Sequence, residues 1–153
     1  MYSREEASRL RQQFWITFGK YMKPVPSSEG LDINWINYKT GVKGIGFKMD
    51  VDQKEAIIAI VIQHSNTEER YRYYEQFESF KTLFRDEIEE DWIWERELVD
   101  ENGNSFSRIS TRLQNVSIFN QSQWPDLIAF LKPRIMALDR FWGNVKEVFE
   151  NVH

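Results

Sequence analysis

The sequence predicts an α+β fold, with a four-stranded and mainly antiparallel sheet packed against helices. Two pairs of short apolar segments are each separated by a polar turn, which is typical of β-hairpins. Three other segments repeat apolar residues every three or four positions, as amphipathic helices do. The order along the chain is therefore α-β-β-α-β-β-α. No linker interrupts the 153 residues, so we expect residues 1–153 to form a single domain.

A first helix is expected over residues 4–22. Ser3-Arg4-Glu5-Glu6 has the form of a capping box, in which the serine and glutamate side chains satisfy backbone donors at a helix start. Apolar residues then recur at helical spacing, namely Ala7, Leu10, Phe14, Phe18 and Tyr21. Pro24 and Pro26 follow, and proline prevents a helix from continuing.

The first hairpin follows a loop at residues 24–30. Ile45, Phe47 and Met49 alternate with glycine and lysine, which predicts a strand with one apolar face. Residues 56–62 are apolar at every position, which is typical of a central strand covered on both faces. The polar residues 50–54 between these segments supply the turn.

A second helix is expected over residues 67–88. Ser65-Asn66-Thr67-Glu68 repeats the capping-box form at its start. Aromatic residues then follow at helical spacing, namely Tyr73, Phe77, Phe80 and Phe84.

A second hairpin is expected from residues 92–99 and 106–113, because Asn102-Gly103 between them is a strong hairpin turn. A type I′ turn places Glu97 opposite Arg108. A type I turn with a glycine bulge places Trp92 opposite Arg112. The sequence leaves both registers open.

A long C-terminal helix is expected to reach about residue 151. Nine apolar residues repeat at alternating steps of four and three, which is a heptad seam: Trp124, Ile128, Leu131, Ile135, Leu138, Trp142, Val145, Phe149 and Val152. Pro133 lies within this stretch, where its ring removes a backbone donor and clashes with the preceding turn. We therefore expect the helix to be kinked or broken near residues 131–132.

Charge is distributed unevenly along the chain. Residues 20–49 contain five lysines and two acidic residues, a local balance of +3, whereas residues 86–101 contain nine acidic residues and one arginine, a balance of −8. The acidic stretch would repel nucleic acid, while the lysine-bearing stretch could contact phosphates or an acidic partner. The plainer interpretation is that both stretches form solvated faces.

The composition excludes several classes of site. The chain has no Cys, so it forms no disulfide, thiolate metal site or cysteine nucleophile. Only His64 and His153 could act as imidazole ligands, too few for a typical zinc site, and we expect no metal and no cofactor. The charged N-terminal residues and the absence of a long apolar run predict a cytoplasmic protein without a membrane span.

No catalytic motif fits its required context. The glycines of TGVKGIG lack the spacing of a phosphate-binding loop and precede a strand, where such a loop precedes a helix. The acidic-x-Lys step Asp52-Gln53-Lys54 lies in the first hairpin turn, not on the buried strand that a nuclease requires.

Two weaker catalytic candidates remain. Glu95 and Glu97 are expected to share one strand face, where ion pairs with arginines across the strands are the favoured role. His64 follows the apolar strand and could serve in acid-base chemistry, although a structural role is more usual. An enzyme using these residues is therefore the least favoured hypothesis.

Four blocks of the sequence resemble a known family. They are EEASRLRQQFWITFGKYM, INWINYKTGVKGIGFKMD, YYEQFESFKTLF followed by DWIWE, and WPDLIAFLKPRIMALDRFW. Together they are similar to a small bacterial domain family of unknown function. The resemblance implies that such domains occur alone or C-terminal to restriction-endonuclease-like nuclease domains in longer proteins. The resemblance identifies no catalytic residues in this sequence.

We therefore expect a non-enzymatic binding module, with nucleic acid or a nuclease- or methyltransferase-type protein as its partner. In the candidate surface, lysines hold phosphates and rings stack on bases. This surface comprises Trp35, Tyr38, Lys39, Lys43 and Lys48. The alternative is an assembly protein that self-associates as a homo-oligomer through the heptad seam of the C-terminal helix, or through its lysine-rich and acidic stretches.

Overall fold

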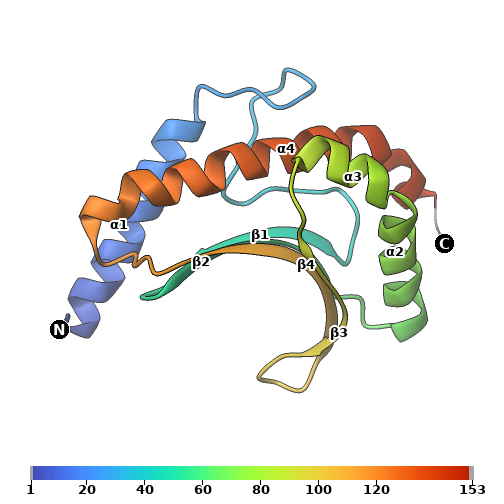
Figure 1. Ribbon diagram of the computed structural model, residues 1–153, viewed down its shortest axis with the longest axis horizontal. Coiled ribbons are helices and arrows are strands. Elements are labelled where there is room, and N and C mark those ends of the chain that lie inside the picture. The colour runs from blue at the N-terminus through green and yellow to red at the C-terminus, as the bar shows by residue number, and fades with distance from the viewer. Residues whose placement is uncertain (1, 152–153) are drawn as a thin grey trace.

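A four-stranded sheet lies at the centre of the molecule, in a computed structural model that describes residues 2–151 (Figure 1). Its strands are β1 (Ile45–Val51), β2 (Glu55–Ile62), β3 (Ile93–Val99) and β4 (Ser105–Gln114). They are ordered β1-β2-β4-β3, and every neighbouring pair is antiparallel. The predicted α+β class and antiparallel sheet are confirmed.

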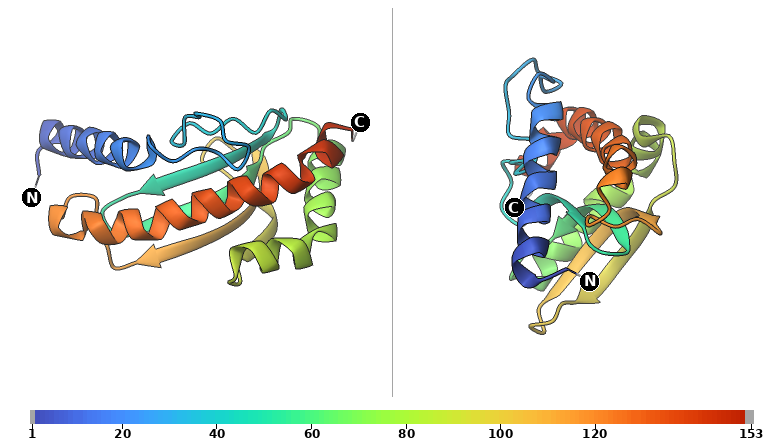
Figure 2. Two further views of the ribbon diagram at one scale, coloured as in Figure 1. Left: turned by 90° about the horizontal axis from the view of Figure 1, so that it is seen from above. Right: turned by 90° about the vertical axis from the view of Figure 1, so that its left-hand side faces the viewer.

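The helices lie on one face of this sheet. They are α1 (Arg4–Met22), α2 (Thr67–Ser79), α3 (Lys81–Ile88) and α4 (Trp124–Glu150), with a short 3-10 turn η1 (Gln121–Gln123) before α4. In Figure 2, α4 runs along the sheet, with α1 near one of its ends and α2 and α3 near the other. The helical face therefore holds the core.

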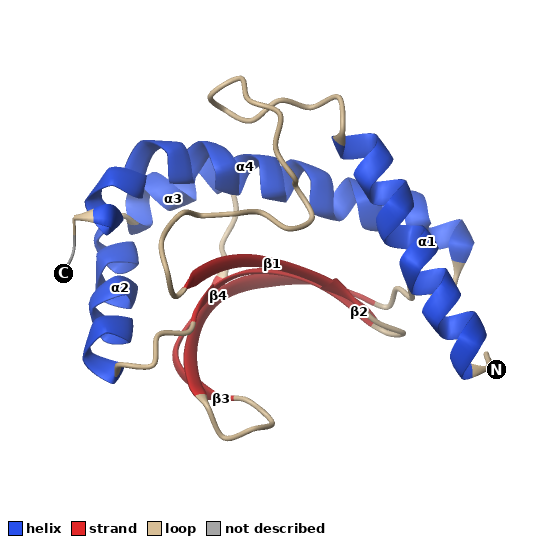
Figure 3. Cartoon of the chain, turned by 180° about the vertical axis from the view of Figure 1, so that it is seen from behind, coloured by secondary structure: helices blue, strands red, loops and turns tan. Residues whose placement is uncertain are grey.

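The opposite, concave face of the sheet carries no helix among residues 2–151 (Figure 3). The expectation that both faces of β2 are covered was wrong. Ile57 and Val61 point to this face and are half-buried. Long side chains of the neighbouring strands shield them, because Val61 lies opposite Arg108 and Ile57 opposite Arg112. An apolar run thus arises without a second layer.

The first helix has the bounds that the sequence predicts. The Ser3 side chain accepts a hydrogen bond from the Glu6 backbone N–H at 3.1 Å and caps the helix. Helix α1 then ends at Met22, two residues before Pro24. Local chemistry is sufficient here because both ends are marked by residues with specific backbone requirements.

The expected second helix is divided into α2 and α3. Phe80 separates them, since its φ of −100° and ψ of 16° depart from helical geometry. Its backbone N–H bonds to Phe77 O at 3.0 Å instead of continuing the regular ladder. The cap also lies one residue later than expected, because Asn66, not Ser65, accepts from Glu69 N–H.

The register of β3 against β4 changes at a β-bulge. Near the turn, Leu98 lies opposite Phe106, but after an irregularity between Glu95 and Leu98, Glu95 lies opposite Arg108. The extra residue of a bulge shifts the pairing by one. Arg108 therefore does not face Glu97, so the register expected for a type I′ turn is not formed.

The other expected register, with a glycine bulge in the turn, is formed next to the turn, where Leu98 lies opposite Phe106 and Val99 opposite Ser105, but the β-bulge ends it before Trp92. Strand β3 begins at Ile93, so Trp92 is not part of the ladder. Arg112 instead lies opposite Ile57 of β2, and its guanidinium contacts the Glu55 carboxylate at 3.0 Å.

Helix α4 is long, as predicted, and continues through Pro133 without a break. It follows an arched course above the sheet (Figure 1). The seam residues from Ile128 to Phe149 are at most 8% exposed, while Trp124 is half-buried and Val152 lies outside the described residues. The heptad seam therefore packs into the protein's own core and is not a free surface.

Candidate functional site

Residues 23–44 form a 22-residue connection between α1 and β1 that contains no helix or strand. Connections of more than about 12–15 residues without regular structure are uncommon in compact domains and are often functional. This connection, here called the α1–β1 loop, runs beside α4 (Figures 1 and 2). It is the longest irregular segment within residues 2–151.

Asp139 of α4 anchors the loop at two points. Its carboxylate is 5% exposed, and Oδ2 accepts from the Ser28 backbone N–H at 2.7 Å. Oδ1 accepts from the Tyr38 hydroxyl at 2.5 Å. A buried carboxylate needs such donors, because an unpaired charge in a poorly hydrated site is strongly unfavourable. The two bonds therefore hold both halves of the loop against α4.

Two indoles add further anchors. The Trp35 Nε1–H donates to Val25 O at 2.9 Å within the loop, and the Trp142 Nε1–H of α4 donates to Thr40 O at 2.8 Å. Gly143 lets the loop approach α4 closely, since an added Cβ would lie 3.1 Å from Ser28 Oγ. Specific hydrogen bonds therefore hold the loop in place.

Tyr38 is a hydrogen-bond donor and not a base. Burial, followed by the neighbouring Asp139 carboxylate, raises the pKa of the Tyr38 hydroxyl far above its usual value. The hydroxyl therefore stays protonated. The ring packs on Phe47 and Trp35 at centroid distances of 5.0 and 6.2 Å. Trp35 is only 3% exposed and presents little face to solvent, whereas Tyr38 is half-buried.

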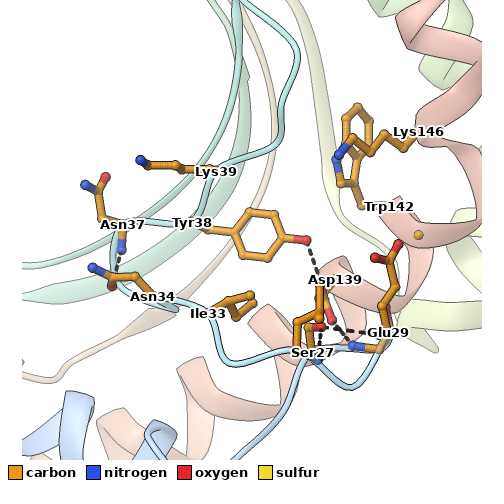
Figure 4. A pocket seen from close by; sticks show the side chains of 13 residues that line it. Ser27, Glu29, Ile33, Asn34, Asn37, Tyr38, Lys39, Asp139, Trp142 and Lys146 are labelled. Atoms are coloured by element: carbon orange, nitrogen blue, oxygen red, sulfur yellow. Dashed lines mark hydrogen bonds between the residues drawn. The ribbon is translucent and has the colours of Figure 1, made fainter.

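A cavity of about 490 Å³ lies between the α1–β1 loop and α4 (Figure 4). Its polar lining includes Glu29, Asn34, Asn37, Lys39 and Lys146, beside the Tyr38–Asp139 pair. In the view of Figure 4, Asn34, Asn37 and Lys39 lie on one side of Tyr38, and Glu29 and Lys146 lie on the other. Small-molecule sites commonly have this size and a few convergent polar groups.

Several polar groups of the cavity have no partner among residues 2–151. Asn34 Oδ1 accepts from Asn37 N–H at 3.0 Å, which leaves the Asn34 NH₂ and the Asn37 side-chain amide available. The Lys146 ammonium extends over Gly41, where an added Cβ would lie 3.0 Å from Nζ. Lys39 is exposed. The cavity therefore offers donors from two elements.

The ion pairs of the molecule distinguish its two kinds of cation. All eight pairs found among residues 2–151 use arginine, and none uses lysine. Five of these arginines neutralise carboxylates of residues 86–101, namely Glu87, Glu90, Asp91, Glu95 and Glu97. Five of the nine carboxylates of the acidic stretch are thus paired within the fold, whereas none of the lysines among residues 2–151 is paired.

The structure brings together only part of the predicted surface. Tyr38 and Lys39 line the cavity, and Trp35 is buried beside them. Lys43 is exposed in the turn before β1. Lys48 lies apart, in a depression of about 240 Å³ on the concave face of the sheet.

Three important cavity residues were not predicted from the sequence. Asp139 lies 101 positions from Tyr38, Lys146 lies still further along the chain, and no local pattern connects them to the loop. Glu29 lies in a segment that composition assigns only to a loop. The single sequence signal was Asp139 itself, an acidic residue beside the apolar seam at Leu138.

His64 and the acidic-x-Lys step at Asp52-Gln53-Lys54 have structural roles. His64 Nδ1 accepts from Asn66 N–H at 3.0 Å and supports the start of α2. Asp52 accepts from the backbone N–H groups of Lys54 and Glu55, so the acidic-x-Lys step forms the β1–β2 turn, as predicted. Within residues 2–151, no group of three or more His, Asp or Glu side chains is arranged to hold a metal ion.

Glu95 and Glu97 do not share a strand face, which corrects the expectation. Glu95 contacts Arg108 at 3.1 Å on the concave side. The bulge turns Glu97 towards α2, where it accepts from Tyr71 and Arg70. These hydrogen bonds lower the pKa of Glu97 to about 2, and the bond from Tyr71 has the largest effect. The two carboxylates therefore stabilise different parts of the fold.

Comparison with known proteins places the chain in a family. The model of the family described as Domain of unknown function (DUF4268) matches residues 10–146. The chain belongs to this family. Its DUF4268 domain includes the whole α1–β1 loop and the part of α4 that carries Asp139 and Lys146, so the cavity lies inside the matched region. No curated protein and no solved structure matches the chain. Among residues 2–151, no helix combines the length and the apolar character needed to cross a membrane.

Proposed function

We propose that this DUF4268 domain is a non-enzymatic module that binds nucleic acid through its phosphates, at the cavity between the α1–β1 loop and α4. One observation carries the proposal. Lys39 and Lys146 both line the cavity, and neither forms an ion pair with a carboxylate among residues 2–151.

The two lysines of the cavity suit an anionic group, because neither is paired with a carboxylate among residues 2–151. Lysine ammonium groups neutralise phosphates and release condensed counterions, which supplies much of the affinity of nucleic-acid-binding proteins. The most buried carboxylate of the cavity, Asp139, already accepts from Ser28 and Tyr38. It therefore competes less for the lysines than an unbonded carboxylate would.

The mode of contact differs from base stacking. Trp35 is buried, and Tyr38 is half-buried with its ring packed on Phe47 and Trp35, so the available groups are mainly ammonium and amide donors. Such groups contact phosphate and sugar and carry little sequence information. We expect salt-sensitive binding with weak sequence preference.

A binding role also fits the chemistry of the buried pair. Burial and Asp139 raise the pKa of Tyr38 and keep its hydroxyl protonated well above neutral pH, and Asp139 is held by two donors. Neither group is arranged to take a proton from a ligand. Both instead fix the shape of the cavity.

Fluorescence anisotropy with a labelled single-stranded oligonucleotide tests the proposal at about 50 mM salt, where counterion release favours binding. The double variant Lys39→Ala and Lys146→Ala is expected to weaken binding. It should also reduce the slope of log K against log salt by about 1 for each phosphate that a lysine no longer neutralises. Lys54→Ala is the matched control, since Lys54 is exposed in the β1–β2 turn and does not line the cavity.

Two results would overturn the proposal. One is the absence of binding by the unmodified protein at high micromolar concentration. The other is an equal loss of affinity in the Lys54→Ala control and in the double variant, because binding would then be diffuse and not centred on the cavity.

A further inference from the structure

The lining of the cavity balances its charges. Lys39 and Lys146 contribute two cations, and Glu29 and Asp139 contribute two carboxylates. A ligand with a single phosphate suits this arrangement better than a ligand with several phosphates, because the cavity has no additional cation to pair with each additional negative charge. Charge alone therefore favours a monophosphate.

The two sides of the cavity differ in the groups that they offer. On one side of Tyr38, the Lys39 ammonium and the side-chain amides of Asn34 and Asn37 are donors, and such donors suit a phosphate. On the other side lie the Glu29 carboxylate and Lys146 (Figure 4).

Glu29 supplies the acceptor that a sugar requires. Its carboxylate makes no hydrogen bond as an acceptor with another described residue. A carboxylate with available oxygens can accept from adjacent hydroxyl groups, and an acidic side chain does this with ribose in dinucleotide-binding folds. The 2′-hydroxyl is the group by which proteins distinguish RNA from DNA.

We propose that the cavity binds one ribonucleotide unit with a single phosphate, held at Lys39, Asn34 and Asn37, while its ribose hydroxyls donate to Glu29. A volume of about 490 Å³ can hold one such unit. The inference rests on the proposed function and names its ligand class. The unit is either a strand end of RNA or a free ribonucleoside monophosphate, which share this chemistry.

Isothermal titration calorimetry with the four ribonucleoside 5′-monophosphates, their 2′-deoxy counterparts and ATP tests the inference. The expected result is that at least one ribonucleotide binds about tenfold more tightly than its deoxy counterpart, because hydrogen bonds to a charged acceptor are strong. ATP should bind more weakly than AMP. Glu29→Gln should reduce the preference for ribose, whereas Asp32→Asn, an exposed residue of the same loop outside the cavity, should leave it unchanged.

Competition against the labelled oligonucleotide separates the two sources of the unit. Displacement of RNA by the monophosphate supports a strand end, and monophosphate binding without displacement supports a free nucleotide. If the oligonucleotide binds but no monophosphate does, this inference is overturned and the proposed function stands. If neither binds, both are overturned. Equal affinity for ribose and deoxyribose removes the assignment of Glu29.

Discussion

The hydrogen bond between Tyr38 and Asp139 gives the most direct test of how the cavity is built. Tyr38→Phe removes the hydroxyl and leaves the ring, which still packs on Phe47 and Trp35. Asp139 then keeps one of its two donors, the Ser28 N–H at 2.7 Å. The substitution therefore isolates one charge-assisted bond without opening a hole in the core.

The magnitude follows from the surroundings of the bond. A hydrogen bond to a charged group contributes about 1.5–3 kcal/mol to stability. Asp139 borders the cavity, where water can replace part of the missing interaction, so we expect a loss of about 1.5–2 kcal/mol. For a chain of this size, this loss lowers the melting temperature by roughly 3–8 °C.

Urea unfolding followed by tryptophan fluorescence and circular dichroism measures the change. The matched control is Tyr21→Phe, since Tyr21 is 55% exposed. It should remain within about 0.5 kcal/mol of the unmodified protein. The double variant Tyr38→Phe and Asp139→Ala should show a coupling energy of about 1 kcal/mol or more, as expected for residues in contact.

A Tyr38→Phe variant as stable as the Tyr21→Phe control would contradict this reasoning. A coupling energy near zero would do so as well. In either case the Tyr38–Asp139 bond would have no part in holding the loop, which would then depend on the Ser28–Asp139 bond and the indole anchors.

Three further predictions concern other parts of the fold. The pKa of Glu97 is lowered to about 2 in the folded protein, from 4.5, so its ionised form stabilises the fold above about pH 4.5 and this contribution disappears as the pH falls towards 2. Glu97→Gln should therefore be less stable than the unmodified protein in urea at pH 6, and the difference should vanish near pH 2; a difference independent of pH would contradict the role of the charge. Gly41 has a φ of 81°, so Gly41→Ala should lower the stability by about 1 kcal/mol or more in thermal unfolding. The added methyl group should also displace the Lys146 side chain. An unchanged melting temperature would argue against this backbone conformation. Because the α4 seam is buried, light scattering should find no dimer formed through it, and a dimer that dissociates on mutation of seam residues would refute this.

The parts of the fold that the sequence predicts correctly depend on local chemistry. Helix α1 has a capping serine at its start and prolines after its end, and both act within a few residues. The β1–β2 turn likewise depends on Asp52, which bonds to the next backbone amides. Such features can be read without knowledge of tertiary contacts.

The errors arise where tertiary packing decides. The apolar spacing of Phe77, Phe80 and Phe84 continues across the junction of α2 and α3, so periodicity conceals the break at Phe80. The bulge in β3 has no Gly or Pro to mark it. It places Glu97 against Arg70 of α2, a contact that joins residues 27 positions apart.

The candidate site was predicted only in part for the same reason. Tyr38 and Lys39 line the cavity, and they could be predicted because a cation beside a ring is a pattern visible in the sequence. The hydrogen bond that gives Tyr38 its role spans 101 positions and reaches Asp139. No rule based on spacing connects an irregular loop to one carboxylate on a distant helix.

The anchoring of the α1–β1 loop also has a consequence for how the protein is made. Asp139, Trp142 and Gly143, which hold or admit the loop, all belong to the last helix of the chain. While a ribosome synthesises the protein from its N-terminus, the loop emerges long before these partners exist. The cavity can form only after α4 has docked, so a nascent chain acquires any ligand affinity only once α4 has been synthesised.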